Sequence, residues 1–363
     1  RVAYNLFAQT AGSELSDYER WVQITEPGQG DDMLRMNGAG ENLAWSAADF
    51  ENFLEPRPDP APIMESELEP IVELLAENKW PFRIHATYDE TIDRFLGVFE
   101  RVNGRQPFQT RFIIDHAETV SARNIERIKA LGGGIAIQHR MAYQGEYFVS
   151  RYGAEAAKAT PPIRKMLETD VPVGAGTDAT RVASYDPWVA LYWLTTGKTV
   201  GGMQLSDETE VLDRETALRL WTQGSAWFSG EAEVKGTLAG GQYADFAVLS
   251  ADYMTVPEQE IRQISSVLTV VGGKTVYGEG DFSDLSPPIP TASPSWSPVN
   301  AEPSPASRPD MDAQPRMERS CHDGCSNGCS LHGHDHQIAW TRPLPVQDKS
   351  SFWGALGCSC FAF

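Results

Sequence analysis

The stretch RFIIDHAETVSARNIERIKALGGGIAIQH, residues 111–139, shows how most of this chain is organised. Its two ends, RFIIDHA and GGIAIQH, are short and mainly apolar, whereas the middle part, SARNIERIKALG, is amphipathic. Short apolar runs are typical of strands buried on both faces, and helically spaced apolar residues are typical of a helix. Ser121 is well suited to cap the start of that helix. The stretch therefore predicts a strand, a helix and a second strand parallel to the first.

The same alternation continues on both sides of this stretch. We expect further strands at residues 1–7, 81–86 and 171–179, and helices at residues 14–24, 65–80, 89–103, 161–170, 186–197 and 213–230. This order predicts an α/β fold in which helices cover a parallel sheet. Residues 26–62 and 140–160 show no such pattern, and we interpret them as loops that shape a binding site or as surface excursions.

The sequence changes in character after the α/β body, which we place at residues 1–230. Residues 231–280 contain short strand-like runs separated by Gly turns, and they predict a small C-terminal β unit, part of a sandwich. Residues 281–320 are rich in Pro and Ser and are predicted to be a linker without a packed core. Residues 321–363 hold all five cysteines, and we expect them to be a disordered Cys/His-rich tail.

The net charge of -20, from 50 acidic and 30 basic residues, argues against nucleic acid or an anionic membrane as a partner. No apolar run approaches the roughly 18 residues that a membrane span needs. The chain opens at Arg1 inside an expected strand, so we expect it to start within a longer protein. We slightly favour the cytoplasm as its location and leave the periplasm open.

Three expected strands end in side chains that can bind a metal, namely His85, His116 and Asp178. His139 ends a fourth strand. In a parallel α/β barrel all strand C-termini emerge on one face, so these side chains should converge there. A single His at a strand end is more often structural, but matched positions on several strands favour a metal site. Two imidazoles and a carboxylate are the smallest protein ligand set of a catalytic zinc ion.

The segments RIHA with His85, IIDHAE with His116 and GAGTDAT with Asp178 resemble the amidohydrolase superfamily of metal-dependent hydrolases. The resemblance continues through TLAGGQYADFAVL at residues 237–249 and covers about residues 1–280. Within the superfamily, the sequence is most similar to the branch that contains N-substituted formamide deformylase. The resemblance implies a partial (β/α)8 TIM-like barrel that holds strands three to eight, with residues 1–7 as the third strand.

The resemblance also implies roles for the residues. His85, His116 and Asp178 would bind a zinc ion at the barrel mouth, and Asp178 would move a proton from water to a leaving nitrogen. The implied reaction is hydrolysis of a non-peptide carbon–nitrogen bond in a small amide, formamide or cyclic amide. His139 is expected either to contact this substrate or to make a structural hydrogen bond. Arg181 could meet an anionic substrate, although pairing with a loop acid is the favoured interpretation.

The sequence departs from the family pattern in two places. The His-x-His pair of the first barrel strand is absent, and six strands cannot close an eight-stranded barrel without a substitute for the missing edge. A homo-oligomer and association with a missing N-terminal segment are therefore both considered as partners. The family often has a metal-bridging Lys or Glu on strand four, where this chain has Arg35 and Met36, with Glu41 as a weaker alternative. We therefore expect one metal ion in the barrel rather than two.

The tail contains a second candidate metal site, a dense cluster of thiols and imidazoles. Its members are Cys321, Cys325, Cys329, His332, His334 and His336. Such ligands suit zinc or Cu(I), although disulfides or an unstructured His-rich tail are alternatives, and five cysteines cannot all pair internally. A second functional hypothesis follows, in which an inactive hydrolase body carries a metal-sequestering tail. A His-x-His pair encoded upstream of Arg1 would favour the enzyme over this alternative.

Overall fold

The computed structural model describes residues 1–50, 53–179 and 182–288. Residues 1–287 form one compact unit. Arg181 and all of the tail residues predicted to bind metal lie outside the described residues, so these predictions stay untested.

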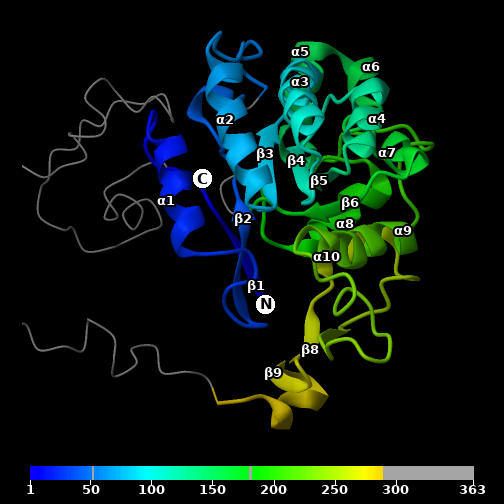
Figure 1. Cartoon of the computed structure of the whole chain (residues 1–363). Helices are drawn as coiled ribbons and strands as arrows, with labels where there is room; N and C mark the ends of the chain where they lie inside the picture. Colours follow the sequence, from blue (N-terminus) through cyan, green and yellow to red (C-terminus); the bar gives the residue numbers. More distant parts are fainter. Residues whose placement is uncertain (51–52, 180–181, 289–363) are drawn as a thin grey trace, which may run out of the picture. The chain divides into compact units, whose positions relative to one another are not determined.

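The unit is built on a six-stranded sheet in which every neighbouring pair of strands is parallel. The strands follow one another in chain order: β1 Val2–Leu6, β2 Leu34–Ala39, β3 Phe82–Ala86, β4 Phe112–His116, β5 Gly134–Gln138 and β6 Val173–Gly176. The sheet curls as half of a barrel, with helices along its outer side (Figure 1). The predicted α/β class with a parallel sheet is confirmed.

Helices connect the strands. They are α1 Glu14–Ile24, α2 Met64–Glu77, α3 Asp89–Arg105, α4 Ala122–Ala130, α5 Met141–Tyr152, α6 Ala154–Ala157, α7 Ile163–Thr169, α8 Pro187–Thr196, α9 Arg214–Arg219 and α10 Ser225–Phe228. The first four and α7 pack in the order α1, α2, α3, α4, α7. The Ser121 side chain accepts a hydrogen bond from the Asn124 backbone N–H at 3.3 Å, which confirms the predicted cap of α4. None of the described helices is both long enough and apolar enough to span a bilayer.

The interpretation of residues 26–62 as a loop was wrong, because this segment contains β2. Its sequence, LRMNGA, lacks the β-branched residues that usually mark a strand. Backbone proximity explains the composition: a Cβ atom on Gly38 would lie 1.9 Å from the Pro81 carbonyl oxygen. At Gly40 the φ angle is +102°, and a Cβ atom would lie 2.0 Å from the Arg83 carbonyl oxygen. These glycines let the chain run directly against β3.

Residues 140–160 were also wrongly interpreted as a loop, because α5 and α6 occupy most of this segment. The buried residues of α5 are Met141, Ala142, Gly145 and Phe148. This spacing marks one face of a helix, so the pattern was present in the sequence.

The predicted C-terminal β unit is a three-stranded antiparallel sheet of β7 Phe246–Leu249, β8 Ser266–Val271 and β9 Lys274–Gly278. Arg1, which precedes β1, donates from Nε to Asp245 Oδ2 at 2.6 Å, just before β7. Its guanidinium also lies over the Tyr243 ring, 3.7 Å from the ring centroid. These contacts tie the small sheet to the edge of the parallel sheet.

A cluster of phenylalanines fixes the two strands that matter most for the site. Phe82 opens β3 and Phe112 opens β4, and their rings are stacked with centroids 5.8 Å apart. Phe99 of α3 packs edge-on against Phe82 at 5.4 Å, and all three rings are buried. Truncating one such ring typically costs about 3–5 kcal/mol. The packing at the start of these strands holds their other ends in register.

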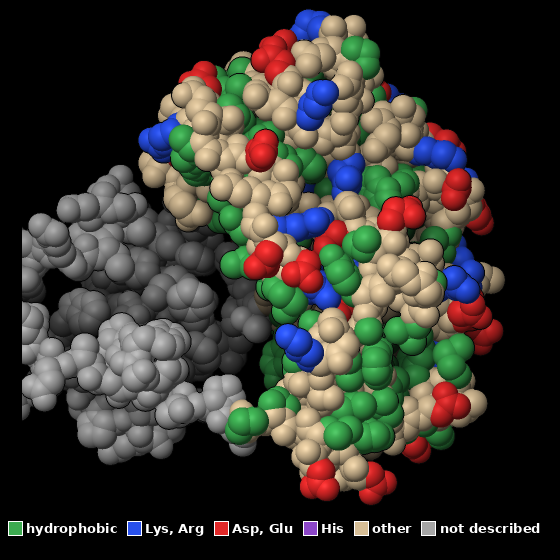
Figure 2. Space-filling model, turned by 60° about the horizontal axis from the view of Figure 1, so that its bottom comes forward, with side chains coloured by type: hydrophobic (Ala, Val, Ile, Leu, Met, Phe, Trp, Pro, Cys, Tyr) green, Lys and Arg blue, Asp and Glu red, His purple; other side chains and the backbone are tan. Residues whose placement is uncertain are grey.

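The surface carries charges of both signs. On the face shown in Figure 2, acidic and basic side chains are interspersed, and apolar side chains gather below them.

Candidate metal centre

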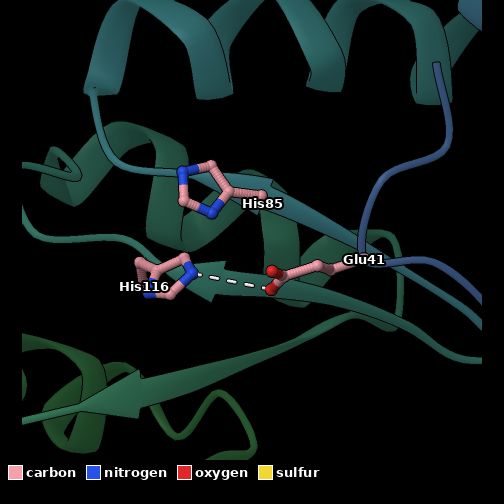
Figure 3. A group of neighbouring side chains, drawn as sticks. All are labelled: Glu41, His85 and His116. Atoms are coloured by element: carbon pink, nitrogen blue, oxygen red, sulfur yellow. Dashed lines mark ion pairs between the residues drawn. The ribbon is translucent and has the colours of Figure 1, made fainter. Parts of the chain in front are cut away.

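Three side chains that can bind a metal meet beyond the carboxyl ends of β2, β3 and β4 (Figure 3). His85 is the penultimate residue of β3, and His116 is the last residue of β4. Glu41 follows β2 by two residues. Parallel pairing places Ala86 opposite His116, so the two imidazoles reach the same edge of the sheet. The expected convergence of His85 and His116 is therefore present, and Glu41 joins them.

The three side chains are close enough to share one ion. Each offers a ligand atom, and these atoms lie within 4.8 Å of one another. Glu41 Oε2 is 3.5 Å from His116 Nε2, and the two imidazole centroids are 4.3 Å apart (Figure 3). We call Glu41, His85 and His116 the ligand cluster.

The burial and bonding of the ligand cluster fit a metal ion. His85 and His116 are 5% and 2% exposed. Nδ1 of His85 and Nδ1 of His116 have no hydrogen-bond partner among the described residues, and Nε2 of His116 faces the Glu41 carboxylate as an ion pair. A buried polar atom left without a partner typically costs about 1–3 kcal/mol. A carboxylate with two imidazoles is a donor set that suits zinc and similar divalent ions.

The backbone at the end of β4 is strained in order to present His116. His116 and Ala117 have φ angles of 78° and 54°, which residues other than glycine seldom adopt. Such a conformation typically costs about 1–3 kcal/mol and is often found at functional sites. The Ala117 N–H donates to the Ala86 carbonyl at 2.9 Å, which holds the turn against the end of β3.

Opposite charges dominate the electrostatics of the ligand cluster. Burial lowers the pKa of His116, but nearby carboxylates, with Glu41 the strongest, outweigh it and raise the pKa to about 9. Burial likewise acts to raise the pKa of Glu41, but the two imidazoles and Arg83 lower it to about 2. Without an ion, the cluster therefore pairs a carboxylate with a protonated His116 at neutral pH.

Asp178 lies close to the ligand cluster but is not part of it. It follows β6 by two residues, has a φ angle of 53° and is exposed. Surrounding protein atoms nevertheless desolvate its carboxyl group in part and raise its pKa, while His116 and His85 act in the opposite direction. Because it follows the carboxyl end of a parallel strand, it lies at the same edge of the sheet as the ligand cluster. The role of Asp178 as a third ligand stays a prediction.

His139 is fully buried just after β5. Burial lowers its pKa to about 4, so the ring is neutral at physiological pH. A backbone interaction with Gly176, the last residue of β6, acts against this lowering of the pKa, and the His139 ring lies edge-on to Tyr143 at 5.6 Å. Both interpretations of His139, contact with a substrate and a structural hydrogen bond, stay predictions.

Two buried ion pairs support the strand ends, and the sequence analysis missed both. Arg83 Nε donates to Asp115 Oδ2 at 2.6 Å, linking β3 to β4. Arg140 Nε lies 3.1 Å from Glu118 Oε1, linking the segments that follow β5 and β4. The motif IIDHAE contains both carboxylates. Two acidic residues close to a buried histidine were therefore the sequence signal from which these ion pairs could have been expected.

An α/β half-barrel with a carboxylate and two imidazoles at its carboxyl edge defines a barrel protein built to bind a metal ion. The chain belongs to the amidohydrolase family, whose model matches residues 1–277.

Two curated relatives are similar to part of the chain. They are a putative amidohydrolase, YtcJ, from Bacillus subtilis (strain 168), 24% identical over 197 residues, and N-substituted formamide deformylase from Arthrobacter pascens, 26% identical over 196 residues. Each match covers 53% of this chain but only 37% and 36% of the respective relative.

Two solved structures share the fold. They are uncharacterised metal-dependent hydrolases from Pyrococcus horikoshii OT3 and Pyrococcus furiosus, with TM-scores of 0.54 and 0.53 at 26% and 27% identity. Each match covers 70% of this chain and 52% of the other chain. The chain thus spans about half the length of these structures and less of the curated relatives.

Proposed function

We propose that the protein is a metal-dependent hydrolase of a non-peptide carbon–nitrogen bond in an amide, formamide or cyclic amide. The observation that carries this proposal is the ligand cluster, with two buried imidazoles whose Nδ1 atoms have no hydrogen-bond partner among the described residues. Membership of the amidohydrolase family supports hydrolysis, and the similarity to N-substituted formamide deformylase supports the type of bond.

Glu41, His85 and His116 would hold one divalent ion, and we propose zinc. The chemistry that such an ion supplies when bound is Lewis acidity, which polarises a carbonyl group and makes water a better nucleophile near neutral pH. The protein contributes a fixed site of opposite charges, in which the strained turn at His116 orients one ring.

Asp178 is the candidate for moving the proton. The residue is exposed to solvent, yet desolvation by surrounding protein atoms raises the pKa of its carboxyl group. A carboxyl group with a raised pKa holds a proton more readily at working pH. We assign to its Oδ atoms the transfer of a proton from the attacking water to the leaving nitrogen.

Phe50 supplies an apolar surface beside the ligand cluster. Its side chain is 43% exposed, and its ring is tilted over the His85 ring with centroids 4.2 Å apart. An exposed aromatic ring at this position can pack against an apolar part of a substrate. We therefore favour amides whose nitrogen carries an aryl or alkyl group.

The experiment uses the full chain loaded with zinc and measures amine released from N-substituted formamides, ammonia or amine released from simple amides, and the amino acid formed when a cyclic amide opens. We expect turnover that a chelator abolishes and zinc restores. His85→Ala should lose it, whereas replacing Cys321, Cys325 and Cys329 with Ser should lower total bound metal and spare turnover. Undiminished turnover in His85→Ala, or no hydrolysis of any of these substrates, would overturn the proposal.

A further inference from the structure

Asp49 is a fully buried carboxylate that precedes Phe50, outside every strand and helix. It accepts hydrogen bonds from the Thr87 backbone N–H at 3.1 Å to Oδ1 and 2.9 Å to Oδ2. It also accepts one from the Tyr88 N–H at 3.1 Å to Oδ2. Asp49 is therefore fixed against the backbone that leaves β3, directly behind His85.

The same carboxylate faces His85. Its Oδ1 lies 3.1 Å from His85 Nε2, within the range of an N–H···O hydrogen bond. The other polar neighbour of this nitrogen is Thr87 Oγ1, which is farther away at 3.4 Å and carries no charge. His85 Nδ1 has no hydrogen-bond partner among the described residues. Figure 3 shows one ring nitrogen of His85 turned toward His116 and Glu41 and the other turned away.

We propose that Asp49 is a positioning residue that keeps the His85 proton on Nε2 and thereby leaves the Nδ1 lone pair free for the ligand cluster. The inference deepens the proposed function and rests on it. A neutral imidazole carries its proton on one nitrogen, and the hydrogen bond made by that nitrogen selects the tautomer. The Asp49 carboxylate favours the tautomer protonated on Nε2 more strongly than the Thr87 hydroxyl group favours either tautomer, because its hydrogen bond to the imidazole N–H is charge-assisted.

The anchoring of Asp49 makes the selection rigid. Two backbone N–H groups, of Thr87 and Tyr88, fix where the Asp49 carboxylate lies, so the carboxylate cannot follow the imidazole if the ring turns. The ring is also confined by its neighbours, because Phe50 and His116 lie at centroid distances of 4.2 and 4.3 Å. Removing such a partner of a metal-binding histidine typically weakens metal affinity about 10–100-fold.

Asp89 provides a matched control. It lies at the start of α3, accepts the Ser121 N–H at 2.7 Å and accepts from Asn124 Nδ2 at 2.8 Å. Like Asp49 it holds a neighbouring loop through a backbone N–H, but its described hydrogen bonds involve no histidine. Asp89→Asn therefore tests the general cost of replacing a loop-holding carboxylate.

The first measurement uses the zinc-free full chain with 15N-labelled histidine, and His85→Gln assigns the His85 signals. Long-range 1H–15N spectra report which ring nitrogen carries the proton. We expect the Nε2–H tautomer in the wild type and in Asp89→Asn, and a shift toward Nδ1–H or a mixture in Asp49→Asn. A wild-type proton on Nδ1, or an unchanged tautomer in Asp49→Asn, would overturn the inference.

The second measurement titrates zinc alone while following the His85 signals, so that zinc bound elsewhere in the chain is not counted. We expect binding about 10–100-fold weaker in Asp49→Asn and within about 2-fold of the wild type in Asp89→Asn. Equal affinities in all three proteins would contradict a positioning role. If wild-type His85 does not respond to zinc, the proposed function fails, and the tautomer spectrum still decides on Asp49. If Asp49→Asn does not fold, the wild-type tautomer decides.

Discussion

Glu41 Oε2 lies 3.5 Å from His116 Nε2, although β2, which precedes Glu41, and β4, which ends at His116, are not neighbours in the sheet. Strand β3 runs between β2 and β4, and its His85 completes the group. The contact crosses β3 because the turn after β2 brings Glu41 over the end of the sheet, and the left-handed backbone at His116 turns its ring to meet it. The candidate metal centre thus depends on backbone conformation at two strand ends.

Glu41→Gln is expected to weaken zinc binding by at least about 10-fold, because a neutral amide replaces the one anionic ligand of the cluster. Zinc titration followed through the His116 signals measures the effect. Glu90→Gln removes an exposed carboxylate that pairs with Arg57, and it should leave the affinity unchanged. Equal zinc affinity in wild type and Glu41→Gln would remove Glu41 from the ligand cluster.

Asp178→Asn is expected to lower kcat about 10²–10⁴-fold, because an amide cannot accept the proton from water. The measurement compares kcat, KM and zinc content of the variant and the wild type on the best amide substrate. A role in proton transfer affects mainly kcat. Retention of wild-type kcat would exclude Asp178 from the reaction.

Arg83→Met is expected to destabilise the fold by about 3–5 kcal/mol at neutral pH, because it leaves the fully buried Asp115 without its partner. Burial already raises the pKa of Asp115, and Arg83 acts against this effect. Without Arg83, the folded protein binds a proton at Asp115 more readily than the unfolded chain does. The loss of stability should therefore be largest above the folded-state pKa of Asp115 and should shrink as pH falls through it.

Urea unfolding at several pH values measures this loss. Arg57→Met breaks the exposed pair with Glu90 and removes the guanidinium from the Tyr88 and Tyr152 rings, and it should cost at most about 2 kcal/mol at any of these pH values. An Arg83→Met variant as stable as Arg57→Met would show that the buried pair does not hold β3 to β4.

Phe50→Ala is expected to raise KM for N-aryl amides about 10-fold, with a smaller effect on amides that carry only small groups. The reason is the loss of the exposed ring beside His85. Phe246→Ala on β7 removes a similarly exposed ring, 37% accessible, from another part of the chain and should leave KM unchanged. Parallel increases in KM for all amides, or none, would argue against a substrate-contacting role for Phe50.

The parts of the fold that could be predicted are those in which local pattern and burial agree. The strands that carry His85 and His116 are mostly buried and begin with apolar residues, and the helices that follow them, α3 and α4, show a single apolar face. Strand β2 was missed because close backbone contacts determine part of its composition. Glycine is required at positions 38 and 40, where the chain touches the Pro81 and Arg83 backbone, and such a contact produces no hydrophobic periodicity in the sequence.

The residues of the candidate site could be predicted only where they end a strand that the sequence itself reveals. His85 and His116 were found because polar residues stand out at the end of apolar strands. Glu41 was ranked low because its strand was not recognised, so its position just after a strand end carried no weight. Asp49 could not be found at all, since it follows no strand and reaches His85 only through the packing of its loop on the backbone after β3.

The most direct test of the metal centre is anomalous diffraction at the zinc edge from crystals of the zinc-loaded protein. The account predicts a peak about 2.0–2.2 Å from the Glu41 carboxylate, from Nδ1 of His85 and from a ring nitrogen of His116. A zinc-loaded crystal in which these three side chains hold no anomalous peak would contradict it.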